Sequence, residues 1–168
     1  MKSRLLIFAL IISVLTACAP TAKPLASQNG IEIDQARIVV PGTVTPMAGM
    51  DMSGTSMPSM NIGTDSLASY LIIRNTSSAD DQLLSASVDF AGMVTLHKSV
   101  VDSNNVATMQ EVQSIDIPAG QTVTLQPGGF HIMLMNLKSI PQVGSKITLT
   151  LVFQKAGTII VQADVTSE

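Results

Sequence analysis

The sequence predicts an all-β domain, an antiparallel sandwich or barrel of about eight to nine short strands. After residue 30, no run of eleven residues places apolar side chains at the i, i+3, i+4 and i+7 positions of an amphipathic helix. Short runs rich in β-branched residues recur instead, and residues typical of turns separate them. Residues 146–153 alternate between apolar and polar side chains, as expected for a strand with one buried face.

Turn residues occupy five of the breaks between the expected strands. The first two of these breaks are rich in asparagine, aspartate and serine. The last three contain glycine, and two of them also contain proline. These breaks are residues 75–78, 102–105, 118–120, 127–129 and 156–157. The expected strands, in chain order, are residues 31–40, 69–75, 82–87, 93–101, 109–117, 122–125, 130–137, 146–153 and 158–165.

The composition excludes several classes of protein. Hydrophobic residues make up 46% of the 168 residues and charged residues 12%, so the chain as a whole is not of the disordered class. A single cysteine excludes an internal disulfide and any zinc or iron–sulfur site built from several cysteines. A net charge of −3 argues against a nucleic-acid partner. Ten methionines and the absence of tryptophan are the unusual features.

The first 17 residues are typical of an export signal. Lys2 and Arg4 precede an apolar run over residues 5–17, which is shorter than the roughly 20 residues of a membrane-spanning helix. The end of this run, Leu15-Thr16-Ala17-Cys18, is similar to the bacterial lipobox, in which the cysteine becomes the lipidated first residue of the mature chain. A short buried helix is one alternative, and a secreted protein with a stray thiol is another.

We therefore expect three parts in the chain. They are a lipoprotein signal peptide over residues 1–17, a lipidated Cys18 with a flexible tether over residues 18–30, and a β domain over residues 31–168. The protein is then exported and held at the cell membrane by its N-terminal lipid, facing the periplasm or the cell exterior. We expect a monomer.

Two histidines and two methionines form a candidate metal site. His97 and Met109 lie on neighbouring expected strands, while His131 and Met133 are two residues apart on one strand, so that the latter two share a face. Imidazole with thioether ligands favours Cu(I), whereas zinc favours thiolate or carboxylate beside imidazole. The alternative is that the methionines fill the core and the histidines are satisfied core residues.

The four residues follow the spacing H(M)-x10-M-x21-H-x-M, and the sequence resembles the periplasmic copper chaperone family called PCuAC. Residues 127–135, with the sequence PGGFHIMLM, are similar to the family's PGG-aromatic-H-x-M-L-M segment. Residues 153–157 are similar to its F-x-K-A-G turn, and residues 70–75 to its early strand. The resemblance covers about residues 31–165.

The resemblance implies a cupredoxin-like β-sandwich that binds Cu(I) through these four side chains. It also implies delivery of copper outside the cytoplasm toward cytochrome c oxidase, with oxidase subunit II or a Sco-type assembly protein as the partner. Two positions differ from the family pattern. Lys98 stands in place of an optional second methionine, and Gln35-Ala36-Arg37 in place of an aromatic residue in the first strand.

Other functions predict different chemistry. A copper storage or resistance lipoprotein would hold the ion without delivering it. A blue-copper electron carrier requires a cysteine thiolate beside two histidines, and the sole cysteine, Cys18, precedes the domain. A surface module for protein contacts would bind no metal. We expect no enzyme, because both histidines belong to the motif and neither a carboxylate pair nor a phosphate-binding glycine loop is evident.

A second group of methionines lies in residues 47–60, among glycine, serine, proline and aspartate. This segment resembles the methionine motifs of extracellular copper transporters, and Asp51 would help to attract a cation. It predicts a weaker second copper site, or a lid that hands Cu(I) to the four-residue site; the alternative is a flexible loop with loosely packed methionines. Met93 and Met135 remain as ordinary core candidates. The five methionines of the segment are Met47, Met50, Met52, Met57 and Met60.

Replacing these five methionines with isoleucine removes every thioether of the segment while keeping side chains of similar size. If the segment captures Cu(I), the variant binds fewer copper ions per chain or loads more slowly, as measured by Cu(I) titration. Unchanged stoichiometry together with an unchanged loading rate contradicts the prediction.

Overall fold

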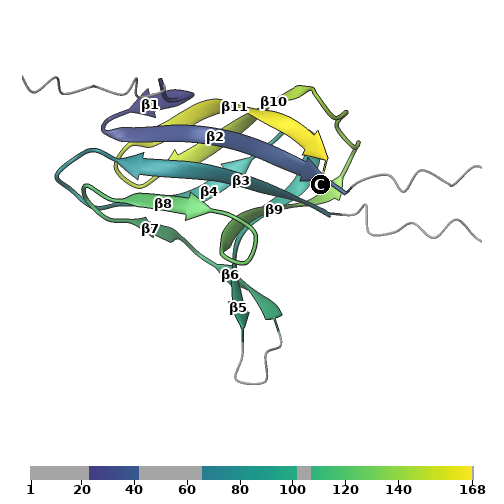
Figure 1. The fold of residues 1–168 in the computed structure, drawn as a ribbon, viewed down its shortest axis with the longest axis horizontal. Coiled ribbons are helices and arrows are strands. Elements are labelled where there is room, and N and C mark those ends of the chain that lie inside the picture. The colour runs from purple at the N-terminus through teal and green to yellow at the C-terminus, as the bar shows by residue number, and fades with distance from the viewer. Residues whose placement is uncertain (1–22, 42–65, 102–106, 168) are drawn as a thin grey trace, which may run out of the picture.

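A computed structural model describes residues 23–41, 66–101 and 107–167, and all regular elements in these ranges are strands (Figure 1). No helix in this part of the chain is long and apolar enough to cross a membrane. The strands are β1 (Ala26–Gln28), β2 (Ile31–Val40), β3 (Ser66–Asn75), β4 (Asp81–Ser87), β5 (Ala91–Val101), β6 (Ala107–Val112), β7 (Ile115–Ile117), β8 (Thr122–Leu125), β9 (Phe130–Leu137), β10 (Lys146–Phe153) and β11 (Gly157–Ser167).

The strands form one continuous mixed sheet that is not closed into a barrel. Its order is β6-β5-β9-β8-β3-β2-β11-β10-β4-β7, with β1 paired to β2. The beginning of β3 pairs with β9 and its end pairs with β8. β3 thereby connects strands β6, β5, β9 and β8 to the strands from β2 to β7 at the other end of this order. Most pairs are antiparallel, as expected, but β11 pairs with β2 and β8 with β9 in parallel. The all-β class is confirmed, and eleven strands replace the expected eight to nine.

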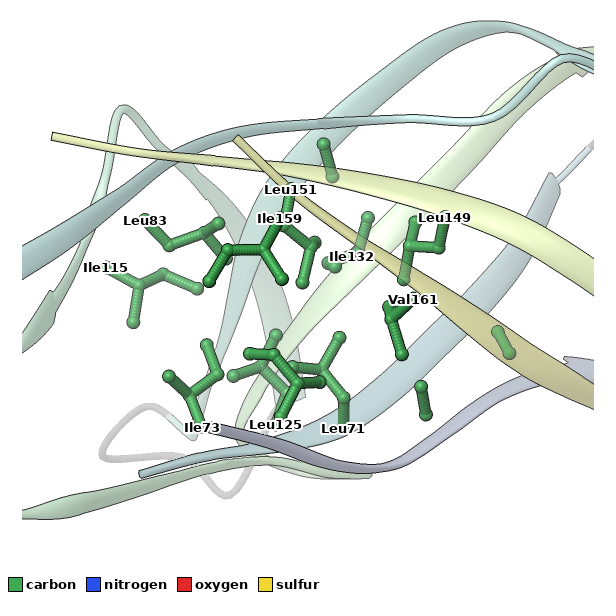
Figure 2. Close-up of a cluster of buried hydrophobic side chains, with 14 of the residues drawn as sticks. Leu71, Ile73, Leu83, Ile115, Leu125, Ile132, Leu149, Leu151, Ile159 and Val161 are labelled. Atoms are coloured by element: carbon green, nitrogen blue, oxygen red, sulfur yellow. The ribbon is translucent and has the colours of Figure 1, made fainter. Parts of the chain in front are cut away.

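Period-2 alternation of apolar residues builds a single core. Over residues 149–153 of β10 and 159–165 of β11, for example, every second residue is buried, and the intervening residues are exposed or half-buried. Because the chain has four phenylalanines and no tryptophan, leucine, isoleucine and valine fill most of this core. Figure 2 shows a part of this cluster, in which side chains from β3, β4 and β7 to β11 lie together. The labelled residues are Leu71, Ile73, Leu83, Ile115, Leu125, Ile132, Leu149, Leu151, Ile159 and Val161.

Two predictions about the chain's organisation are wrong. Residues 109–117 do not form one strand: β6 pairs with β5, whereas Ile115 and Ile117 of β7 enter the core beside β4. The tether does not extend to residue 30, because β1 forms a hairpin with β2 and the Leu25 amide donates a hydrogen bond to the Ile33 carbonyl over 2.8 Å. Asn29 and Gly30 make this turn with positive φ angles.

Buried polar side chains hold the turns at one end of the sheet. The Asp81 carboxylate, which is 5% exposed, accepts hydrogen bonds from the backbone amides of Gln82, Lys155 and Ala156 at 2.7–2.9 Å. The fully buried Asn75 amide donates to the carbonyls of Ala79 and Ile117. Backbone groups that no strand partner reaches are thereby satisfied, as burial requires.

Replacing Asp81 with alanine leaves three backbone amides without their acceptor, two of them from the turn after β10. We expect the free energy of unfolding to fall by about 2–4 kcal/mol, measured by urea denaturation. The control is Asp116→Ala, because Asp116 is exposed and accepts only a solvent-exposed hydrogen bond from Gln82. An equal loss in both variants contradicts a specific role for Asp81.

Candidate metal centre

The pairing of β5 with β9 places the two histidines side by side. His97 and His131 are register partners in this antiparallel pair, and their ring centroids lie 5.7 Å apart. Partners in an antiparallel pair point to the same face of a sheet. The neighbouring pair, Leu96 and Ile132, points to the opposite face and belongs to the core. Both imidazoles therefore lie on the outer face of β5 and β9.

His131 is only 4% exposed although it lies on this outer face. The Tyr70 ring of β3 packs beside it, with the two ring centroids 6.5 Å apart. The Arg37 guanidinium lies 5.4 Å from the centroid of the Tyr70 ring, a cation–π geometry. Arg37 follows an irregularity in β2 at Gln35, where φ is 50°, and its carbonyl accepts a hydrogen bond from the buried Ser69 hydroxyl. These contacts exclude water from one side of the His131 ring.

Each histidine uses one ring nitrogen in a hydrogen bond. The His131 Nδ1 lies 3.1 Å from the Gly129 carbonyl oxygen, and since a carbonyl only accepts, Nδ1 carries the proton. The His97 Nε2 lies 2.9 Å from the Thr95 hydroxyl oxygen. The other nitrogen of each ring, His97 Nδ1 and His131 Nε2, is buried and has no hydrogen-bond partner among the described residues.

Such nitrogens are uncommon in folded proteins, because a buried polar atom without a partner costs about 1–3 kcal/mol. A neutral imidazole nitrogen is also a good metal ligand, and a ligating histidine usually donates its other N–H to a fixed acceptor. The hydrogen bond from His131 to Gly129 has this form. The two rings thus offer two nitrogen ligands to one ion.

The two methionines of the candidate set flank the histidine pair on the same face. Met133 of β9 is half-buried and is the register partner of Thr95. Met109 of β6 is 62% exposed and is the register partner of Ser99. Met133 and Met109 therefore lie on opposite sides of the His97–His131 pair, each displaced from it by two residues along the strands. Each methionine is thus a diagonal neighbour of His97 on an adjacent strand, and long side chains reach across such separations of about 7–8 Å.

The structure thus brings the four predicted residues to one face over three adjacent strands. Within residues 23–41, 66–101 and 107–167, no three histidine, cysteine, aspartate or glutamate side chains form a group that could hold a metal ion. The candidate set differs from such groups because half of its ligands are thioethers. Cys18 and the methionine segment 47–60 lie outside the described residues.

The prediction that Met93 and Met135 are core residues is wrong. These two are register partners on the outer face of β5 and β9, and Met93 is 48% exposed. The apolar residues Ile132 and Leu134 occupy the inward positions of β9 instead. The pairing register decides which face of a strand is buried. Apolar residues occur on both faces of β9, so the sequence does not indicate that Met133 and Met135 are on the outer one.

Sequence reasoning missed the groups that support the histidines. Thr95 and Gly129 each precede a histidine by two residues. Alternation along β5 places the Thr95 side chain on the same side as the His97 ring, whereas Gly129 contributes a backbone carbonyl from the turn before β9. That spacing is a signal available in the sequence. The approach of Tyr70 and Arg37 depends on the pairing of β3 with β9 and β2, for which the sequence offers no signal.

Comparison with known proteins identifies the relatives of this chain. Residues 31–165 match the family model described as "Putative lipoprotein LpqE-like". The chain is 40% identical over 97 residues to "Putative lipoprotein Lxx21020" of Leifsonia xyli subsp. xyli, an alignment that covers 57% of this chain and 58% of that relative.

Solved structures share the fold. The apo PCuAC domain from PmoF1 superposes with a TM-score of 0.64 at 21% identity, covering 84% of this chain and 98% of that domain. The solution structure of CuI-DR1885 from Deinococcus radiodurans superposes with a TM-score of 0.51 at 27% identity, covering 78% of this chain and 76% of that one. The cupredoxin-like β fold expected from the sequence is therefore confirmed.

Proposed function

We propose that this chain, which belongs to the LpqE-like lipoprotein family, is a copper(I)-binding carrier that acts outside the cytoplasm. His97, Met109, His131 and Met133 are the proposed ligands. Copper is the cargo of this protein, which captures the ion and passes it on. The structural likeness to CuI-DR1885, at 27% identity, supports this choice of ion.

The observation that carries the proposal is the pair of buried ring nitrogens, His97 Nδ1 and His131 Nε2, without a hydrogen-bond partner among the described residues. They belong to rings 5.7 Å apart, and thioether-bearing residues stand on either side of them. Two imidazoles with thioethers make a site for a soft ion, because the set contains neither thiolate nor carboxylate. Thioethers also remain usable in an oxidising compartment, since they form no disulfides.

The proposal also covers the delivery of copper and the attachment of the protein to the membrane. Neutral ligands on a sheet face, one of them on the exposed Met109, suit an ion that must leave again. We propose that Cys18 is lipidated after removal of residues 1–17, consistent with the lipoprotein family, and that the domain faces the periplasm or the cell exterior. The recipient implied by the resemblance is the copper centre of cytochrome c oxidase, through subunit II or a Sco-type protein. A storage or resistance role is the alternative.

His97→Ala and Met133→Ala each remove one proposed ligand. We expect either variant to lose the tight equivalent of Cu(I), measured by competition with a colorimetric Cu(I) chelator, while the unfolding midpoint in urea stays near that of the wild type. The control is Ile160→Ala, since Ile160 is an exposed apolar residue on β11. Tight binding retained in both ligand variants refutes the ligand set, and no binding by the wild type favours a protein-contact module.

Thr95 is a positioning residue rather than a ligand in this proposal, because its hydroxyl holds the Nε2 atom of His97. Loss of such a supporting hydrogen bond typically weakens metal binding by about 10–100-fold. We expect that weakening of Cu(I) affinity in Thr95→Val, with unchanged stoichiometry. Thr108→Val on β6 removes a hydroxyl that donates to the Val100 carbonyl and serves as the matched control. Equal affinities in the two variants contradict the role of Thr95.

A further inference from the structure

We propose that Met93 and Met135 form a second, weaker Cu(I) site on the outer face of β5 and β9, beside the proposed four-residue site. The inference deepens the proposed function and rests on it for the identity of the ion. The two residues are register partners in the antiparallel pair. Directly opposite side chains of such a pair have Cβ atoms about 4.5–5.5 Å apart, so two flexible thioethers can contact one ion.

The distribution of methionine in the fold supports this site. The described residues contain four methionines, and none belongs to the hydrophobic core cluster. This pattern is unusual, because methionine is commonly a buried residue that fills gaps in cores. Isoleucine and leucine fill the inward positions of β9 here, whereas the thioethers occupy the outward positions. Packing alone does not explain why sulfur collects on the one face that also carries both histidines.

The surroundings leave the sulfur atoms accessible. Met93 is 48% exposed and Met135 is half-buried. On the β3 side of this face, the register partners of Met135 and Met133 are the small residues Ser66 and Ala68. No charged side chain stands in these two register positions, so a monovalent soft ion meets neutral thioethers.

Met133 connects the two sites. It lies between Met135 and His131 on β9, two residues from each, and its partner Thr95 lies between Met93 and His97 on β5. From Met93 to His97 the strand rises by about 13 Å, and Met133 stands about midway. When the four-residue site is empty, an ion held by Met93 and Met135 can also bind Met133, and it reaches the imidazoles when Met133 stays bound and nitrogen replaces the two other sulfur atoms. The copper stays Cu(I) throughout, so the step needs no oxidant or reductant.

The test uses Ag(I), a soft ion that does not change oxidation state, and the methyl signals of ¹³C-methyl-labelled methionine. The full chain carries Cys18→Ser, which removes the competing thiol, and the five substitutions of Met47, Met50, Met52, Met57 and Met60 by isoleucine, so that segment 47–60 contributes no thioether. We expect the first equivalent of Ag(I) to shift the Met109 and Met133 methyl signals and the second to shift those of Met93 and Met135.

Variants separate the two sites. Met93→Leu with Met135→Leu removes the second equivalent and keeps the first, whereas the control Ile160→Leu keeps both. The inference is overturned if the Met93 and Met135 signals do not move through two equivalents, or if the second equivalent persists in the double variant. Shifts of Met93 and Met135 without any shift of Met109 and Met133 contradict the proposed function and leave the second site standing.

Discussion

The antiparallel register between β5 and β9 is the constraint on which the candidate site depends. It sets His97 opposite His131. The same register then pairs the outward residues Thr95 with Met133 and Met93 with Met135. A shift of one residue would turn the histidines into the core and the core residues Leu96 and Ile132 toward solvent. Core burial and site geometry are therefore set by the same hydrogen-bonded ladder.

Neighbouring strands shield the His131 side chain of this pair from water. β3 contacts β9 at its beginning and β8 at its end, which brings Tyr70 against the His131 ring. The irregularity in β2 carries Arg37 over Tyr70, and the buried Ser69 hydroxyl bonds to the Arg37 carbonyl. The irregular stretch of β2 at Gln35 thus supports the tyrosine beside the histidines. Far from this face, Asn75 and Asp81 hold the turns that end the strands.

The distribution of polar and sulfur groups separates stability from binding. Aliphatic side chains and Phe153 make up the core, which contains no methionine among the described residues. Thioethers and imidazoles share the outer face, where an ion can enter and leave. Their ligand chemistry is soft and neutral, which agrees with a cargo that is passed on. The lipoprotein family of the chain agrees with work outside the cytoplasm, where thiols are less dependable ligands.

The all-β class and most strand limits follow from the sequence alone, because alternation and turn residues are local signals; residues 31–40, 122–125, 130–137 and 146–153 agree with the structure without change. The spacing of two histidines and two methionines was equally visible. Only the tertiary structure decided that the chain from Leu25 joins the sheet, that residues 109–117 serve two different strands, and that Met93 and Met135 face outward. Those outcomes depend on long-range pairing, which determines the face of every residue in a strand and which no local pattern contains.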